Sequence, residues 1–246
     1  AGAGLVSAVL PAGTTGPIAA LAPEAMAHAL PCQRGELDSQ TFRQWRSSLD
    51  TFGVLVLGPG LGTGAGARSL LADLLAAPPA RLLLDADALN LLAREGPLKP
   101  FADGARIIIT PHPGEAARLL GTTAAAVQAD RPAAVRQLAD ATGAVVVLKG
   151  CATLVCAPGR RPQMNLCGNP GMASGGSGDV LAGVIGALWG QGLDAWAAAR
   201  LGVWLHATAG DLAAWRGGEV PLIARDQIGA LGAALALLNE SSTPDG

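Results

Sequence analysis

One stretch of the chain joins a glycine-rich segment to a single carboxylate at the start of an apolar run. Residues 169–179 read Asn-Pro-Gly-Met-Ala-Ser-Gly-Gly-Ser-Gly-Asp, and an apolar segment from Val180 to Gln191 follows. Main-chain N–H groups of such a loop, together with the unpaired donors of a helix first turn, form a site for phosphate or another anion. A carboxylate inside an anion site is suited to a general base that takes a proton from a hydroxyl group, and we expect this role for Asp179.

Asp179 also has a purely structural interpretation. Aspartate at a helix N-terminus caps exposed N–H groups and interacts favourably with the helix dipole. A single cap does not need the four glycines that fall between residues 171 and 178, whereas close approach of the backbone to a ligand does. We therefore favour the functional interpretation of this segment.

Polar residues follow four consecutive segments that the sequence predicts to be strands. The apolar runs Ile107–Ile109 and Val145–Leu148 are typical of parallel strands buried on both faces. Ligands in parallel sheets bind beyond the carboxyl ends of the strands. Four strands that each end in polar residues indicate one shared cleft, formed by residues 58–62, 85–90, 110–115 and 149–150.

Two of these clusters contain acidic residues with more than one interpretation. Asp85 and Asp87 are suited to bind Mg²⁺ through water, or one of them caps a helix that begins near Ala88. Glu115 lies near a helix start, where an acid suits the dipole. Asn90 follows Asp87 on the same segment, and we include it as a supporting residue.

His112 and Lys149 are the cationic or titratable candidates at the strand ends. His112 lies between two prolines that fix the direction of its ring, which favours contact with a ligand. Lys149 is one of only two lysines and ends an apolar strand, so it either extends to solvent along that surface or binds a phosphate group. We favour the phosphate.

Strand-like and helix-like segments alternate along the chain, which predicts one doubly wound α/β sandwich over residues 1–246. The expected strands are 5–10, 25–30, 53–57, 81–84, 106–110, 144–149, 153–157 and 163–166. The expected helices include 64–76, 88–94, 113–120, 131–142, 177–191, 194–215 and 225–239.

The composition excludes several classes of protein. Half of the residues are apolar and the formal net charge is −2, which indicates a globular chain without a nucleic-acid surface. No apolar run reaches the ~18 residues of a membrane span, and no basic segment precedes the first apolar stretch. The four cysteines show no metal-binding spacing, and we expect them to be reduced and buried in a cytoplasmic protein.

A dinucleotide-binding dehydrogenase is a competing interpretation. Gly60-x-Gly62-x-x-Ala65 matches a loose dinucleotide fingerprint, and Asp85 lies 25 residues beyond Gly60, near the position of a ribose-binding acid. This interpretation gives residues 174–179 no role. It also places the fingerprint after the third predicted strand, whereas a dinucleotide fingerprint is expected after the first.

Taken together, these residues resemble the ADP/ATP-dependent (S)-NAD(P)H-hydrate dehydratases of the ribokinase-like superfamily. The matching segments occur in family order along nearly the whole chain: 4–6, 58–62, 85–90, 110–115, 148–150 and 169–179. Ser174 and Ser177 stand where the family more often has threonine. The resemblance implies a three-layer αβα sandwich with a mostly parallel central sheet.

The resemblance also implies a reaction: ADP or ATP, with Mg²⁺ carried by the nucleotide, phosphorylates the hydroxyl group of hydrated NADH or NADPH, and loss of phosphate restores the cofactor. Asp179 is then the base, and it binds the hydrate together with Gly62 and His112. The residues implied to bind the nucleotide are Lys149, Gly150, Cys151, Ala152, Thr153, Gly176, Ser177 and Gly178. Supporting positions are Asp85, Asp87, Asn90, Glu115 and Asn169, and no direct metal ligand is assigned.

Further expectations come from the family as a whole. Its members begin with an additional strand and helix that we expect this chain to lack, tend to form homotetramers, and in many bacteria follow an epimerase domain. A vitamin-precursor kinase of the same superfamily, of the hydroxyethylthiazole or hydroxymethylpyrimidine type, shares the loop that ends at Asp179. A catalytically silent nucleotide-binding protein is the third alternative.

Overall fold

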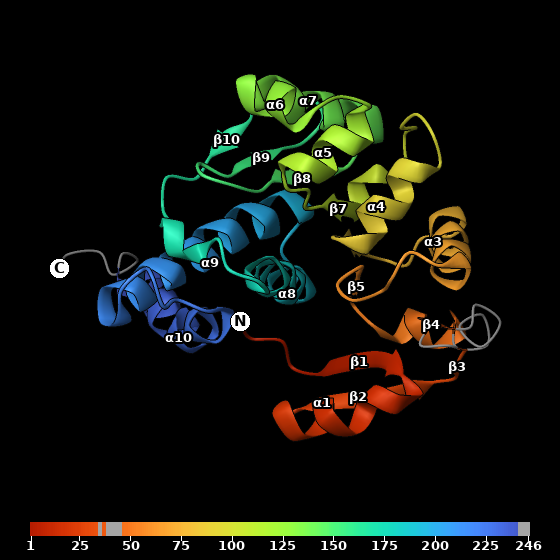
Figure 1. Ribbon diagram of the computed structural model, residues 1–246, viewed down its shortest axis with the longest axis horizontal. Coiled ribbons are helices and arrows are strands. Elements are labelled where there is room, and N and C mark those ends of the chain that lie inside the picture. Colours follow the sequence, from red (N-terminus) through yellow and green to blue (C-terminus); the bar gives the residue numbers. More distant parts are fainter. Residues whose placement is uncertain (34–35, 38–45, 241–246) are drawn as a thin grey trace.

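A six-stranded sheet forms the centre of the computed structural model, which describes residues 1–33, 36–37 and 46–240 (Figure 1). The strand order is β10-β9-β8-β7-β6-β5. Strands β5 to β8 run parallel, whereas the β8–β9 and β9–β10 pairs are antiparallel. The strands are β5 (Leu55–Leu57), β6 (Leu82–Leu84), β7 (Ile107–Ile109), β8 (Val145–Leu148), β9 (Leu154–Cys156) and β10 (Gln163–Met164).

Helices cover both faces of this sheet, which gives three layers (Figure 1). Successive strand residues point to opposite faces, so Leu82 and Leu84 pack into one core and Leu83 into the other. The first core is closed by α3 (Ala65–Ala76), α4 (Asp87–Arg94), α5 (Pro113–Leu120), α6 (Ala124–Ala129) and α7 (Arg131–Thr142). The second is closed by α8 (Ser177–Gly190), α9 (Ala195–Gly217) and α10 (Ala224–Glu240). The predicted αβα sandwich with a mostly parallel sheet is confirmed.

The N-terminal elements form a small unit of their own. Strands β1 (Val6–Pro11) and β2 (Ala25–Leu30) pair in parallel with each other and belong to no larger sheet among the described residues. The helix α1 (Thr15–Leu21) connects them. A third, two-stranded sheet consists of β3 (Cys32–Gln33) and β4 (Glu36–Leu37). The doubly wound pattern predicted for the whole chain therefore holds from β5 onward.

Short helical turns complete the described chain: η1 (Ala12–Thr14), η2 (Arg46–Thr51), η3 (Gly104–Arg106) and η4 (Pro170–Met172). Across the described ranges, none of the helices combines the length and apolar character that crossing a bilayer requires.

The ends of β5 and β6 are packed backbone against backbone at Gly58. The N–H of Asp85 donates to the carbonyl oxygen of Leu57 at 3.0 Å. A Cβ at position 58 would lie 1.7 Å from the carbonyl oxygen of Asp85, and Gly58 has a φ of +130°. Only glycine permits both the contact and the backbone angle, so this residue fixes the position of Asp85 relative to the loop that follows β5.

We expect Gly58→Ala to lower the free energy of unfolding by about 3 kcal/mol or more, because a steric clash adds to backbone strain. Gly60→Ala is the matched control: its φ is +67° but no atom lies within 4 Å of the new Cβ, so only the strain of roughly 1 kcal/mol applies. Urea unfolding of the two variants tests this difference. Equal losses of stability would show that the close contact at Gly58 is not restrictive.

Candidate active site

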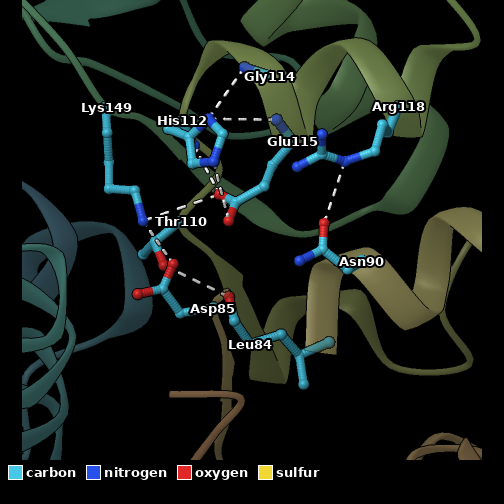
Figure 2. A network of polar contacts seen from close by, with 9 residues as sticks. All are labelled: Leu84, Asp85, Asn90, Thr110, His112, Gly114, Glu115, Arg118 and Lys149. Atoms are coloured by element: carbon cyan, nitrogen blue, oxygen red, sulfur yellow. Dashed lines mark hydrogen bonds and ion pairs between the residues drawn. The ribbon is translucent and has the colours of Figure 1, made fainter. Parts of the chain in front are cut away.

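The ends of the parallel strands meet at one lysine. The Nζ of Lys149, after β8, lies 2.6 Å from Oδ1 of Asp85, after β6, and 3.9 Å from Oε2 of Glu115, in the first turn of α5 (Figure 2). The side chains of Asp85 and Glu115 are 1% and 5% exposed, and that of Lys149 is 17% exposed. Two buried carboxylates thus share one ammonium group, a cluster in which loss of the cation would leave buried negative charge uncompensated.

His112 and Glu115 form a capping box at the start of α5. The Nδ1 of His112 accepts hydrogen bonds from the backbone N–H groups of Gly114 and Glu115, and the Glu115 carboxylate accepts from the N–H of His112 at 2.8 Å (Figure 2). An accepting Nδ1 places the proton of the neutral ring on Nε2, which lies 3.3 Å from Oε1 of Glu115. Burial, followed by the charges of Lys149 and Arg118, lowers the pKa of His112.

Burial raises the pKa of Glu115, against the opposing effects of the Lys149 charge and the hydrogen bond from His112. The expected role of Glu115 as a first-turn acid is confirmed by the capping box. The direction of the His112 ring is set by this box as well as by the flanking prolines.

Asp87 holds the loop after β5. Its Oδ2 accepts a hydrogen bond of 2.9 Å from the backbone N–H of Gly62. Helix α4 begins at Asp87 with Ala86 as its N-cap, and no side chain caps it. The capping alternative for Asp85 or Asp87 is therefore wrong, because both carboxylates are engaged elsewhere.

Ala86 has a φ of +48°, an unusual value for a residue with a side chain. Such backbone conformations are retained where the surroundings enforce them, frequently at functional sites. Here the turn lies between the two carboxylates of Asp85 and Asp87.

The glycine-rich loop brings the start of α8 to the same lysine. Gly176 is the N-cap of α8, with a φ of +85°, and no side chain caps this helix end. A Cβ on Gly178 would lie 3.4 Å from the Nζ of Lys149. The start of α8 therefore lies beside Lys149 without a side-chain cap, as an anion site at a helix N-terminus requires.

Asp179 lies in the first turn of α8 and forms no ion pair or hydrogen bond with a side chain of the described residues. Its side chain is exposed. Partial burial and the negative charge of Asp85 raise its pKa, while the positive charge of Lys149 lowers it. Because Asp179 does not cap the helix, its carboxylate is available to a ligand.

A buried polar cluster contacts the glycine-rich loop at Ser177. The hydroxyl of Ser177, which is 6% exposed, donates to Oε1 of Gln227 at 3.0 Å and lies 3.4 Å from Nε2 of His206. Burial lowers the pKa of His206. Three helices, α8, α9 and α10, therefore meet at the hydroxyl of Ser177, and this contact fixes where the first turn of α8 lies.

Asn169 anchors the other end of the loop. Its Nδ2 donates to Oδ1 of Asp211 at 2.9 Å, and the N–H of Gly168 donates to Oδ2 of the same carboxylate at 2.8 Å. Oδ1 of Asn169 and Oγ of Ser174 are buried and have no hydrogen-bond partner in the described part of the chain. Unsatisfied polar atoms beside an uncapped helix end fit a loop that completes its hydrogen bonds with a ligand.

The segment after β8 has the backbone shape of a tight turn. Gly150 has a φ of +131° and Ala152 a φ of +53°. The hydroxyl of Thr153 donates to the carbonyl of Gly150 at 2.9 Å. Arg131, at the start of α7, donates to the carbonyls of Leu148 and Lys149 at 3.0 and 3.3 Å. These hydrogen bonds hold the turn in place, and Cys151 lies on its exposed side.

Three residues of these hydrogen-bond networks were not predicted from the sequence. His206 and Gln227 lie on long apolar helices, and Arg131 opens α7. His206 reaches the glycine-rich loop through Ser177. A polar residue fully buried in an apolar helix, such as Gln227 at 0% exposure, is the pattern that points to a network of this kind.

The expectation for the cysteines is wrong in part. Cys156 is buried, but Cys151 and Cys167 are exposed and Cys32 is intermediate, and all four are free thiols. Cys151 follows a glycine in the turn after β8, and Cys167 precedes the glycine-rich loop, so both lie on surface loops and not on core strands.

Within the described ranges, no group of three or more His, Cys, Asp or Glu side chains is arranged to hold a metal ion. Asp85, one of the two Mg²⁺ candidates, is committed to Lys149. The residues present therefore do not form a cage of protein ligands, whereas the uncapped start of α8 fits a phosphate group that carries its own Mg²⁺.

The fold and the strand-end site define an α/β protein that presents an anion-binding helix end beside a free carboxylate. Residues 1–225 match the family model described as NAD(P)H-hydrate dehydratase. The chain therefore belongs to the NAD(P)H-hydrate dehydratase family. The dehydrogenase alternative is wrong, since Asp85 is buried against Lys149 and is not free to bind a ribose.

Relatives agree with this family. The chain is 42% identical over 241 residues to the bifunctional NAD(P)H-hydrate repair enzyme Nnr of Moorella thermoacetica, covering 98% of this chain and 45% of the relative. It is 51% identical over 159 residues to the ADP-dependent (S)-NAD(P)H-hydrate dehydratase of Neisseria meningitidis, covering 64% of this chain and 54% of the relative. The chain thus spans about half the length of these two relatives.

A solved structure supports the fold. The ADP/ATP-dependent NAD(P)H-hydrate dehydratase of Bacillus subtilis, co-crystallised with ATP and Mg²⁺ and soaked with CoA, superposes with a TM-score of 0.78 at 24% identity. The superposition covers 96% of this chain and 82% of the other.

We expect Asp85→Asn to lower the pKa of Asp179, because it removes a repelling charge and leaves the cation of Lys149 less neutralised. Asp87→Asn is the control, since Asp87 does not contribute to the pKa shift of Asp179. Carboxyl-detected NMR titration of Asp179 in the three proteins measures the effect. An unchanged or higher pKa in Asp85→Asn would contradict the electrostatic coupling between these groups.

Proposed function

We propose that the chain catalyses the nucleotide-dependent dehydration of hydrated NADH or NADPH. ADP or ATP donates its terminal phosphoryl group to the hydroxyl of the hydrate, which leaves AMP or ADP. Loss of phosphate from that carbon, with loss of a proton from the neighbouring ring carbon, then restores NADH or NADPH. The observation that carries the proposal is the free carboxylate of Asp179 in the first turn of an uncapped helix, beside Lys149.

Asp179 is the general base in this proposal. Its carboxylate accepts the hydroxyl proton while the hydroxyl oxygen attacks the terminal phosphorus. The carboxylate must be charged to do so, and its pKa is raised by partial burial and by Asp85. Activity is therefore present above the raised pKa and is lost as the pH falls through it.

The backbone N–H groups of Gly176, Ser177 and Gly178 bind the phosphoryl group that is transferred, and Lys149 adds positive charge at the same place. The turn formed by Gly150, Cys151, Ala152 and Thr153 binds the remainder of the nucleotide. The chain supplies little covalent chemistry itself: it positions the two substrates and stabilises the charge that develops on the phosphoryl oxygens.

Gly62 and His112 line the site of the hydrate in this proposal. Asp87 supports Gly62 through the hydrogen bond to its N–H, and Glu115 supports His112 through the capping box. The ring of His112, which is half exposed, contacts the nicotinamide end of the hydrate. Mg²⁺ accompanies the nucleotide and neutralises charge on its phosphates.

The proposal also covers the cellular location, the assembly and the domain organisation of the protein. The protein acts in the cytoplasm and assembles as a homo-oligomer, as the resemblance implies. The relative from Moorella thermoacetica is named a bifunctional repair enzyme. We infer that the full-length protein similarly joins this domain to an epimerase domain.

Recovery of NADH absorbance from NADH hydrate tests the proposal. We expect recovery only when ADP or ATP with Mg²⁺ is present, and phosphate should appear in equal amount. Phosphorylation of hydroxyethylthiazole or hydroxymethylpyrimidine without recovery of NADH would identify a vitamin-precursor kinase instead. Nucleotide binding with neither reaction would identify a catalytically silent protein.

We expect Asp179→Asn to abolish dehydration while leaving nucleotide binding nearly intact, because the amide cannot accept the hydroxyl proton. Loss of a general base alone lowers the rate by roughly 10²–10⁴-fold. Single-turnover kinetics and calorimetry with ADP separate the two effects. Turnover at the rate of the unmodified protein would refute the role of Asp179.

We expect Lys149→Met to weaken nucleotide binding more than hydrate binding. The same change leaves Asp85 and Glu115 as buried carboxylates without a cation and lowers stability by about 3–5 kcal/mol. The double variant Lys149→Met/Asp85→Asn removes one of these charges and keeps the binding test valid in a better-folded protein. Equal losses of affinity for both ligands in calorimetry would argue against contact between Lys149 and the nucleotide.

A further inference from the structure

A surface hollow lies beside residues that we assign to the hydrate site. It has a volume of about 460 Å³ and is lined by Thr63, Asn90, Ala93, Arg94 and Arg118. Thr63 directly follows Gly62, and Asn90 lies on α4, the helix that begins with Asp87. The hollow is therefore continuous in sequence and structure with the residues that we assign to the hydrate, although none of the reacting groups lines it.

Two guanidinium groups line this hollow without a carboxylate partner. The Nε of Arg118, on α5, donates to Oδ1 of Asn90 at 3.1 Å (Figure 2), and the Nη1 of Arg94 donates to the carbonyl of Thr63 at 3.4 Å. Neither arginine forms an ion pair within the described ranges. Glu95, the acid next to Arg94, is held by Arg68 at 2.6 Å, and the lining residues include no acid.

The positive charge of this hollow is opposite in sign to the charge of the neighbouring site, where the proposed reaction takes place. Asp85, Glu115 and Asp179 surround the single cation Lys149, so the place where the ring must react carries net negative charge. The phosphate groups of a dinucleotide are separate from the phosphoryl group that Lys149 and the start of α8 bind, so they need cations of their own. The positive field of Arg118 extends toward the ring site, since it is among the causes that lower the pKa of His112.

We propose that Arg94 and Arg118 bind a phosphate group of the dinucleotide substrate and so anchor it while its nicotinamide end lies at Asp179. Guanidinium groups with free N–H donors match phosphate oxygens in geometry and charge. The inference rests on the proposed function, because the ligand is the dinucleotide of that reaction. The phosphate concerned is either the diphosphate bridge of every such dinucleotide or the 2′-phosphate found only in the NADP series.

The anchor is remote from the reacting atoms, so it binds the ground state and the transition state equally. Its loss raises KM and leaves kcat nearly unchanged. Each charge-assisted hydrogen bond that is lost weakens dinucleotide binding by roughly tenfold or more. A ligand without phosphate gains nothing from the two arginines.

The test uses Arg94→Gln, Arg118→Gln and the double variant, with Arg106→Gln as the matched control. Arg106 is an exposed arginine that directly precedes β7, at the opposite end of that strand from the site, and is paired with Asp103. Calorimetry measures binding of NADH hydrate, NADPH hydrate and the hydrate of reduced nicotinamide riboside, which has no phosphate. Binding of ADP is measured in the same proteins.

We expect the variants at positions 94 and 118 to weaken binding of the dinucleotide hydrates by tenfold or more, with riboside and ADP binding unchanged and Arg106→Gln without effect. Equal losses for NADH and NADPH hydrates assign the contact to the diphosphate, and a loss for NADPH hydrate alone assigns it to the 2′-phosphate. Unchanged dinucleotide binding, or a parallel loss for riboside or ADP, overturns the inference.

The outcome also separates this inference from the proposed reaction. If the unmodified chain binds the dinucleotide hydrates through the two arginines but does not dehydrate them, the anchor stands and the proposed reaction fails. If the unmodified chain binds no dinucleotide hydrate, both are overturned.

Discussion

The ion pair between Lys149 and Asp85 is the constraint on which the site depends. It joins the ends of two strands of the sheet, and through Glu115 it also involves the helix that follows the strand between them. A buried carboxylate pair needs a cation, so the positions of β6, β7 and β8 at this edge are coupled. The start of α8 is packed against the same ammonium group at Gly178, which brings the glycine-rich loop into register with the strand ends.

This arrangement separates structural from reactive acids. Asp85, Asp87 and Glu115 are each occupied by an ammonium group or by backbone N–H groups, and their roles are to hold Lys149, Gly62 and His112 in place. Among these four acids and within the described ranges, Asp179 alone has neither an ion pair nor a hydrogen bond, and its pKa is raised. The glycine-rich loop is held at both ends by polar contacts, so Asp179 keeps its position although it has no partner of its own among the described residues.

The fold and the meeting of polar side chains at the strand ends could be predicted from the sequence, because both depend on local patterns. Alternating apolar strands and helices predicted the layers. Polar residues after successive strands predicted that their side chains meet, as those of Asp85, Glu115 and Lys149 do, since parallel strands place their ends together. The pairing of Lys149 with Asp85 could not be read from positions 64 residues apart, and neither could the contact of Ser177 with Gln227. Exposure of Cys151 and Cys167 was likewise missed, because loop geometry and not residue type decides it.

The central claim is that the start of α8 binds the phosphoryl group being transferred, next to Asp179. A crystal structure of the chain with ADP and Mg²⁺ tests it most directly. We predict the terminal phosphate within hydrogen-bonding distance of the backbone N–H groups of Gly176, Ser177 and Gly178 and of the Nζ of Lys149. A nucleotide bound with its phosphates away from this helix end, with Lys149 still paired only with Asp85, would contradict the account.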